Sequence, residues 1–264
     1  MAIGDLFSAE GRKKRRIEKN CDRVNEKYAQ SPDRFGAMEV LSREGGEAAV
    51  RSLLRRFFWA YDKGIEDHDE KEYAFKALAH LGREQVLPVL TDVLRRADGS
   101  VSWLLKLLVE MVAREEALAI VAATLTACSG NDFERDPQKR VDLIHFLQDF
   151  QTDAAVGALL PLVTDFAEEI RWTAVDALFH LKAEAAREPL LQALVSDESG
   201  RVRARIVEGL AETGWDVKGF TDKVESQLPE GYRLDKGGHV KLVPLKAAEA
   251  AKSKPRKDHG DHGH

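Results

Sequence analysis

The chain is poor in cysteine and aromatic residues, and it has no long apolar run. Its 264 residues include two cysteines, Cys21 and Cys128. This number excludes the disulfide framework of small secreted proteins, so we expect a reducing compartment, the cytoplasm. No window approaches the roughly 18 uninterrupted apolar residues of a membrane span, and the first residues lack the apolar core of a signal peptide. A hydrophobic fraction of 44% nevertheless excludes a wholly disordered chain.

The formal net charge of −5 conceals an uneven distribution. Residues 11–19 carry six Lys or Arg against one Glu, and residues 246–257 carry five against one, so residues 20–245 hold a net charge of −10. Basic ends attract phosphates or acidic protein surfaces. They are also common as solvated termini that aid solubility. A nucleic-acid contact would use these residues of the first run: Arg12, Lys13, Lys14, Arg15 and Arg16.

The strongest signal is an internal repeat of 31 to 38 residues. Each copy combines two amphipathic patterns with apolar residues at steps of three and four, which predict two helices. Gly82 and Gly214 suit helix C-caps, and no run before residue 230 alternates with the period of a strand. One helix pair cannot bury its apolar stripe alone, so neighbouring pairs must stack. The copies open at these positions: Arg34, Lys71, Ser102, Arg140, Arg171 and Arg203.

Two of these copies carry a family resemblance. The series Asp165, Ile170-Arg171, Ala174 and Ala177-Leu178 returns in part as Asp197 and Val202-Arg203, and it resembles HEAT repeats of the short type related to the phycobilisome-lyase family. The resemblance implies an all-α superhelix of about six two-helix repeats. It also implies that each Asp caps a turn and that each Arg bonds it or the next repeat's Asp. Four residues are therefore expected to be structural: Asp165, Arg171, Asp197 and Arg203. Lys71 and Ser102 depart from this pattern, so we expect an interrupted ladder in the N-terminal half.

Both ends of the repeats are expected to be capped. Ile17, Cys21, Val24 and Tyr28 form a narrow apolar stripe on a helix candidate that would cover the first repeat. Apolar residues over 217–228 predict one more helix. The runs YRL and HVKL around Gly237-Gly238 then predict a β-hairpin. We therefore divide the chain as follows: a basic N-terminal helix over 1–30, the repeats over 31–215, a helix and hairpin cap over 216–245, and a disordered basic, His-rich tail over 246–264.

Two acidic stretches with aromatic neighbours are candidates for partner binding. Residues 57–61 concentrate aromatic side chains just before the acidic residues 66–70, which we take as a loop inserted into the repeat, and a second acidic loop surrounds Phe133. Insertions in repeat proteins collect on one edge and often meet the partner. The alternative is that Phe57 and Phe58 belong to the core and the loops are merely solvated. The candidate partner-binding residues are Trp59, Tyr61, Asp67, Asp69, Phe133, Arg51 and Arg55.

The sequence offers little chemistry for catalysis. It has no phosphate-binding glycine loop, no nucleophile elbow and no pair of CxxC steps, and its internal histidines do not cluster. The terminal DHGDHGH holds three histidines, and whether they bind metal stays open. We predict no catalytic residue, cofactor or metal site, and a monomeric scaffold or adaptor that binds another protein. A nucleic-acid-associated protein and, less favoured, a bilin-lyase-like protein that handles a chromophore are the alternatives.

Overall fold

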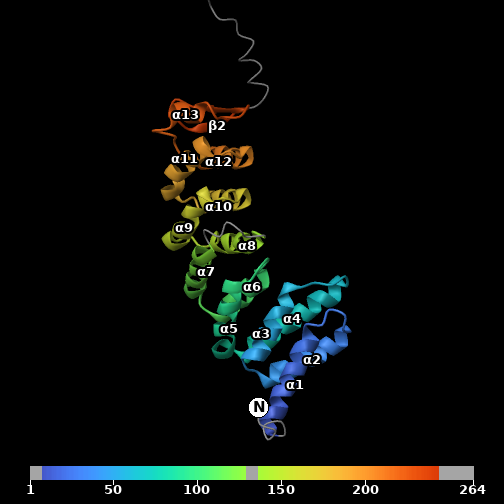
Figure 1. Ribbon diagram of the computed structural model, residues 1–264. Helices are drawn as coiled ribbons and strands as arrows, with labels where there is room; N and C mark the ends of the chain where they lie inside the picture. The colour runs from blue at the N-terminus through green and yellow to red at the C-terminus, as the bar shows by residue number, and fades with distance from the viewer. Residues whose placement is uncertain (1–7, 129–135, 244–264) are drawn as a thin grey trace, which may run out of the picture. The chain divides into compact units, whose positions relative to one another are not determined.

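The computed structural model describes residues 8–128 and 136–243, which form helices and one small hairpin (Figure 1). The helices group into two compact units, residues 1–158 and residues 159–264. The predicted all-α class with a C-terminal hairpin is confirmed. Among the described residues, no helix combines the length and hydropathy that a membrane span needs.

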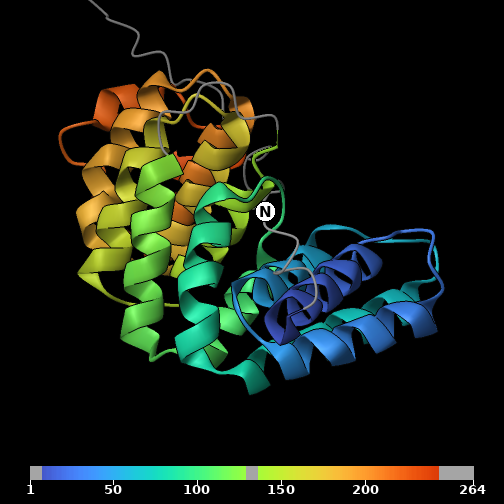
Figure 2. The same ribbon diagram turned by 60° about the horizontal axis from the view of Figure 1, so that its bottom comes forward.

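In the first unit, a capping helix precedes successive helix pairs. Helix α1 packs on both α2 and α3, as Figure 2 shows for the blue helices, and it covers the first repeat. Helix α2 then packs on α4, and α3 packs on α5, so equivalent helices of neighbouring repeats lie side by side. The elements are α1 (Ala9–Val24), α2 (Ser31–Glu44), α3 (Glu47–Arg55), η2 (Arg56–Phe58), α4 (Gly64–Leu81), α5 (Arg83–Arg96), α6 (Ser102–Met111), α7 (Arg114–Cys128), α8 (Gln138–Leu147) and α9 (Asp153–Leu159).

The second unit continues the helix pairs and ends on the hairpin. Strands β1 and β2 pair antiparallel, with Tyr232 opposite Leu242, and β2 packs on α12 while α13 packs on α11. Val240 of β2 is fully buried, so the hairpin closes the apolar face of the last repeat. The elements are η3 (Leu160–Thr164), α10 (Glu168–His180), η4 (Glu184–Ala186), α11 (Arg187–Ser196), α12 (Gly200–Thr213), α13 (Thr221–Glu225), β1 (Tyr232–Leu234) and β2 (Val240–Leu242).

The helix boundaries follow from local capping chemistry. Gly82, with φ 80°, ends α4, and Gly214, with φ 69°, ends α12, as expected for positions where a side chain would be strained. The glycine C-caps inferred from the sequence are therefore confirmed. At two helix starts, the side chain of Asp136 accepts a hydrogen bond from the backbone N–H of Gln138, and that of Thr152 accepts one from the backbone N–H of Ala155.

Two helix predictions are wrong at their ends. Helix α1 ends at Val24, and Tyr28 is 99% exposed instead of completing the apolar stripe, because the backbone turns after Asn25. The helix expected over 217–228 is reduced to α13. Here the N–H of Val217 donates to the carbonyl of Gly238, and Asp216 forms a bridge with His239, so this backbone pairs with the hairpin.

Candidate functional site

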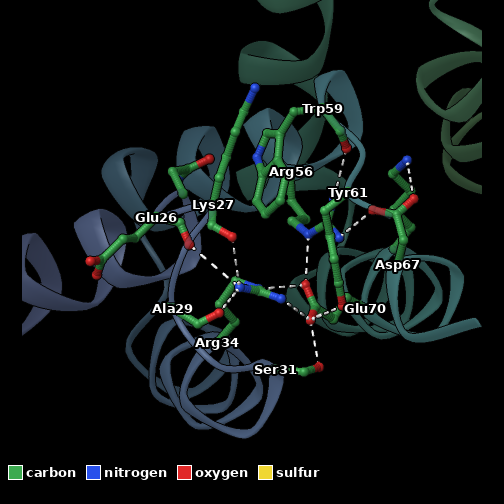
Figure 3. A network of polar contacts seen from close by, with 12 residues as sticks. Glu26, Lys27, Ala29, Ser31, Arg34, Arg56, Trp59, Tyr61, Asp67 and Glu70 are labelled. Atoms are coloured by element: carbon green, nitrogen blue, oxygen red, sulfur yellow. Dashed lines mark hydrogen bonds and ion pairs between the residues drawn. The ribbon is translucent and has the colours of Figure 1, made fainter. Parts of the chain in front are cut away.

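A cluster of three charged side chains lies in the core of the first unit. Arg34 of α2 is 1% exposed, and Arg56 of η2 and Glu70 of α4 are fully buried. Both guanidinium groups point at the carboxylate of Glu70 (Figure 3). Charges this deep are tolerated only where they are paired and hydrogen-bonded, because removing each from water costs several kcal/mol.

Glu70 accepts hydrogen bonds from five donor groups. Nε and Nη2 of Arg34 reach its two oxygens at 2.9 Å each, in the bidentate geometry that suits a guanidinium and a carboxylate. Nε of Arg56, the hydroxyl of Ser31 and the hydroxyl of Tyr61 supply the remaining bonds. Burial alone would raise the pKa of Glu70, but these hydrogen bonds outweigh it and hold the pKa below its ordinary value. The carboxylate is therefore saturated and ionised.

The two arginines also hold the loops beside them. Nη1 of Arg34 donates to the carbonyls of Glu26, Lys27 and Ala29, which form the turn between α1 and α2. Nη1 of Arg56 donates to the carbonyl of Trp59 at 2.9 Å, and its guanidinium lies 3.8 Å from the centre of the indole ring. Two loops that are far apart in sequence are thus fixed to one buried network.

Asp67 completes the network on α4. Its Oδ1 accepts from Nη2 of Arg56 at 2.6 Å, and its Oδ2 accepts from Nζ of Lys71 at 2.8 Å. Burial would raise the pKa of Asp67, but the bonds from Lys71 and Arg56 outweigh it, and the pKa is lowered. Asp67 is therefore a structural ion-pair partner in the described structure, with little surface to offer a partner.

A hollow of about 900 Å³ lies between these two loops. Tyr28 stands at its edge with a 99% exposed side chain. The lining combines aromatic, small apolar and charged residues: Lys27, Tyr28, Ala29, Gln30, Ser31, Pro32, Arg34, Phe35, Ala60, Tyr61, Asp62, Lys63 and Glu66.

The residues that the sequence selected are distributed over several places. Trp59 and Tyr61 join the network, but residues 66–70 lie in α4, so the expectation of an acidic loop there is wrong. This stretch is not an exposed loop because the side chains of Asp67 and Glu70 accept hydrogen bonds from the buried arginines. Phe57 is 8% exposed and stacks on Trp103, in agreement with the core alternative.

The remaining candidates lie away from the hollow's lining. Arg51 of α3 is exposed and pairs with Glu47 and with Asp92 of α5, which links two neighbouring repeats. Arg55 of α3 and Asp69 of α4 are exposed, and Phe133 lies outside the described residues. Their assignment to partner binding stays a prediction.

The repeat arginines make a ladder in the second unit. Nε and Nη2 of Arg171 reach the carboxylate of Asp197 at 2.7 and 3.0 Å, and Nη1 donates to the carbonyl of Asp165 at 2.9 Å. Asp165 and Asp197 accept from the backbone N–H groups of Ala167 and Ser199, and Arg203 donates to the carbonyl of Asp197. Each arginine thus binds its own preceding turn, and Arg171 also binds the next repeat.

Arg34 repeats this arrangement at the first opening of the chain. Like Arg171, it gives Nη1 to the carbonyls of the preceding turn, and Nε and Nη2 to a carboxylate of the next repeat. That carboxylate is Glu70, beside the Lys71 that departs from the pattern. At the third opening, Asp142 accepts from the hydroxyl of Ser100 and the N–H of Val101 instead. The repeat pattern in the sequence marked Arg34 as the start of a repeat, whereas it marked none of the other residues: Arg56, Glu70 and Tyr28.

Comparison with known proteins agrees with the repeat architecture. A family model of HEAT repeats matches residues 131–211, a stretch that contains Asp165, Arg171, Asp197 and Arg203. The match is to HEAT repeats in general, so the phycobilisome-lyase type stays a prediction. No curated protein matches the sequence.

Proposed function

We propose that this HEAT-repeat protein is a non-catalytic adaptor, and that a partner protein docks at the hollow of its first unit. HEAT repeats commonly mediate protein–protein interaction. Stacked repeats offer extended binding surfaces, and their longer connections often meet the partner. The interval from Arg34 to Lys71, which is longer than the next interval, contains one of the two loops that form the hollow.

One observation carries the proposal: Tyr28 is 99% exposed at a hollow whose two loops are fixed by buried arginines. Arg34 fixes the carbonyls of Glu26, Lys27 and Ala29, and Arg56 fixes that of Trp59. Loops that are already ordered lose less conformational entropy on binding than free loops, so a preformed hollow favours affinity. Tyr28 offers a large amphipathic side chain of the kind enriched in interfaces.

The chemistry of the hollow suits recognition better than proton transfer. Glu70 is the buried carboxylate to consider as a catalytic base, but its oxygens already accept hydrogen bonds from five donor groups. A general base must have a lone pair within reach of the substrate's proton. Glu70 is therefore best explained as the centre of a structural network.

Site-specific photo-crosslinking tests the proposal. A photoreactive amino acid replaces Tyr28 in the full-length chain, and a matched variant carries it at Ala119, an exposed position of α7. Native lysate is treated with nuclease, irradiated and analysed by mass spectrometry. We expect one protein to be captured stoichiometrically at position 28 and not at position 119. Equal capture at the two positions, or none at position 28, would contradict docking at the hollow.

The nucleic-acid alternative rests on helix α1. The side chains of its basic run are exposed, although Lys13 and Arg16 both lie against the carboxylate of Glu44. Phosphate binding by this run predicts that all partners are lost on nuclease treatment and that affinity falls steeply with salt. Substituting Arg12, Lys14 and Arg15 by Gln would reduce that salt dependence. The bilin-lyase alternative rests on the repeat pattern alone, and a shared fold does not confer an activity.

A further inference from the structure

We infer that the N-terminal half of α1 binds an acidic segment of the partner protein. The inference rests on the proposed function and adds a second contact at the other end of one helix. The hollow lies beyond the C-terminal end of α1, where the chain turns through Lys27 and Tyr28. The cations lie over residues 12–19. Because a helix rises about 1.5 Å per residue, the two places are roughly 20 Å apart, within reach of one partner.

The cationic half of α1 is open to solvent. Every residue over 12–16 is exposed, whereas Val24 near the other end of the helix is fully buried. Lys14 and Lys19 are exposed and have no ion-pair partner anywhere in the described ranges. These side chains are therefore accessible to a ligand.

The surrounding carboxylates do not cancel the charge of this half. Residues 1–19 contain six Lys or Arg and three Asp or Glu. Glu44 of α2 adds a fourth carboxylate, because it pairs with Lys13 at 3.5 Å and also with Arg16. Six cations against four carboxylates leave a net charge of +2, and all six cations lie within residues 11–19. The excess charge selects an anion.

Helix stability does not explain these cations. The N-terminus of a helix carries a partial positive charge, so Lys and Arg are unfavourable in its first turns. Like charges three or four positions apart also repel each other, as do Arg12 with Arg15 and Arg12 with Arg16. The run therefore weakens the helix on which it lies, and a bound anion would remove that cost.

A short acidic segment fits this surface better than a nucleic acid does. Glu44 already places a carboxylate against Lys13 and Arg16, which shows that the cations of α1 accept this group. The cationic stretch 12–19 is about 12 Å long. Residues 20–245 hold a net charge of −10, so the rest of the chain would repel a long polyanion. An acidic protein segment needs to contact only the cationic half of α1.

Binding of a labelled acidic peptide tests the inference. Fluorescein-labelled hexaglutamate is titrated with the full-length protein, and fluorescence anisotropy gives the affinity. We expect the affinity to fall by at least about 5-fold in the double variant Lys14→Glu/Lys19→Glu, because each reversal replaces an attraction by a repulsion. Thermal unfolding should show no loss of stability in this variant, since a carboxylate near a helix N-terminus is favourable.

The matched control is Lys76→Glu/Lys236→Glu, which changes the net charge equally at exposed lysines of α4 and of the hairpin turn. Its affinity should change by less than about 2-fold. Absence of hexaglutamate binding, or an equal loss of affinity in the two double variants, would overturn the inference. Tighter binding of a short DNA duplex, with the same dependence on Lys14 and Lys19, would overturn it in favour of the nucleic-acid alternative.

Carbodiimide crosslinking then tests the contact with the partner itself. The reagent joins a lysine amine to a carboxylate as an amide, with loss of water, and mass spectrometry locates the link. In the complex captured at position 28, we expect links from Lys14 or Lys19 to Asp or Glu of the partner. Links to other lysines alone would overturn the inference and leave the adaptor proposal intact. Failure of capture at position 28 would instead contradict the adaptor proposal.

Discussion

At the scale of single residues, Glu70 joins the core of the first unit to the two loops that form the hollow. Two guanidinium groups are buried within hydrogen-bond distance of this carboxylate. Two buried arginines are compatible with a stable core only while a carboxylate compensates them, because an unpaired buried charge costs far more than a paired one. The same bonds order the two loops, so stability and the shape of the hollow have a common origin.

Replacing Glu70 by Gln is therefore expected to be severely destabilising. The amide keeps the shape of the side chain but removes the negative charge between Arg34 and Arg56, and the free energy of unfolding should fall by about 3–5 kcal/mol. Glu72→Gln is the matched control: Glu72 is partly exposed and, among the described residues, pairs with Lys106, so its loss should cost much less than that of Glu70. Urea denaturation followed by circular dichroism measures both. Similar losses in the two variants would show that the network is not the stabilising feature.

The lowered pKa values of Glu70 and Asp67 predict a specific loss of stability in acid. A carboxylate whose folded pKa is depressed stabilises the protein above its ordinary pKa, here 4.5 for Glu70 and 3.8 for Asp67, and this contribution disappears as the pH falls through the folded value. The stability difference between the wild type and Glu70→Gln should therefore be constant near pH 7 and shrink as the pH falls below about 4.5. Denaturation midpoints at several pH values test this. A stability difference that grows in acid would mean that the pKa of Glu70 is raised in the folded protein instead of lowered.

At the scale of elements, α10 and α12 of the second unit approach each other closely at Gly209. Gly209 lies in the interior of α12, where glycine is ordinarily about 1 kcal/mol less favourable than alanine. A Cβ at this position would lie 2.3 Å from the ring of Phe179 on α10. Glycine is therefore required here by the approach of the two helices, and its intrinsic cost in a helix is outweighed by packing.

Gly209→Ala should consequently destabilise the protein by about 1–3 kcal/mol, in opposition to helix propensity. Gly157 of α9 provides the control, since nothing lies within 4 Å of a Cβ there, and Gly157→Ala should stabilise by up to about 1 kcal/mol. Thermal unfolding of the two variants gives the sign directly. If both variants are stabilised, α10 and α12 move apart at little cost, and their close contact at Gly209 does not contribute to stability.

The elements also show why part of the structure could be predicted from the sequence. The pairs Asp165–Arg171 and Asp197–Arg203 recur at one spacing, and each bond to the preceding turn is local, so the repeat pattern pointed to them. The network of Arg34, Arg56 and Glu70 joins three elements whose separation in sequence has no fixed period. The sequence placed Asp67 in a surface loop because acidic residues are usually solvated. Two buried arginines reversed that expectation.

At the scale of the whole molecule, the sequence predicted the repeat openings well and the site poorly. In the part of the chain that the structure describes, the six openings lie in α2, α4, α6, α8, α10 and α12, because apolar periodicity is a strong signal for helices that pack on their neighbours. The hollow is formed by a turn after α1 and a loop after η2. Its position depends on where α1 ends: the N-terminal helix was expected to run to residue 30, whereas α1 ends at Val24.

The division into two compact units predicts that a core defect stays local. In repeat proteins each repeat contacts only its neighbours, so stability is nearly a sum of repeat and interface terms. Leu191 of α11 is fully buried, and Leu191→Ala should cost about 2–5 kcal/mol. Hydrogen exchange read by mass spectrometry should then show faster exchange in α10, α11 and α12 and unchanged exchange in α2, α3 and α4. Leu53→Ala, at an equally buried position of α3, should give the opposite distribution. Uniformly faster hydrogen exchange in both units with either variant would mean that the chain unfolds as one cooperative body. The order of the loops that form the hollow would then depend on every repeat, instead of only on the repeats that contain those loops.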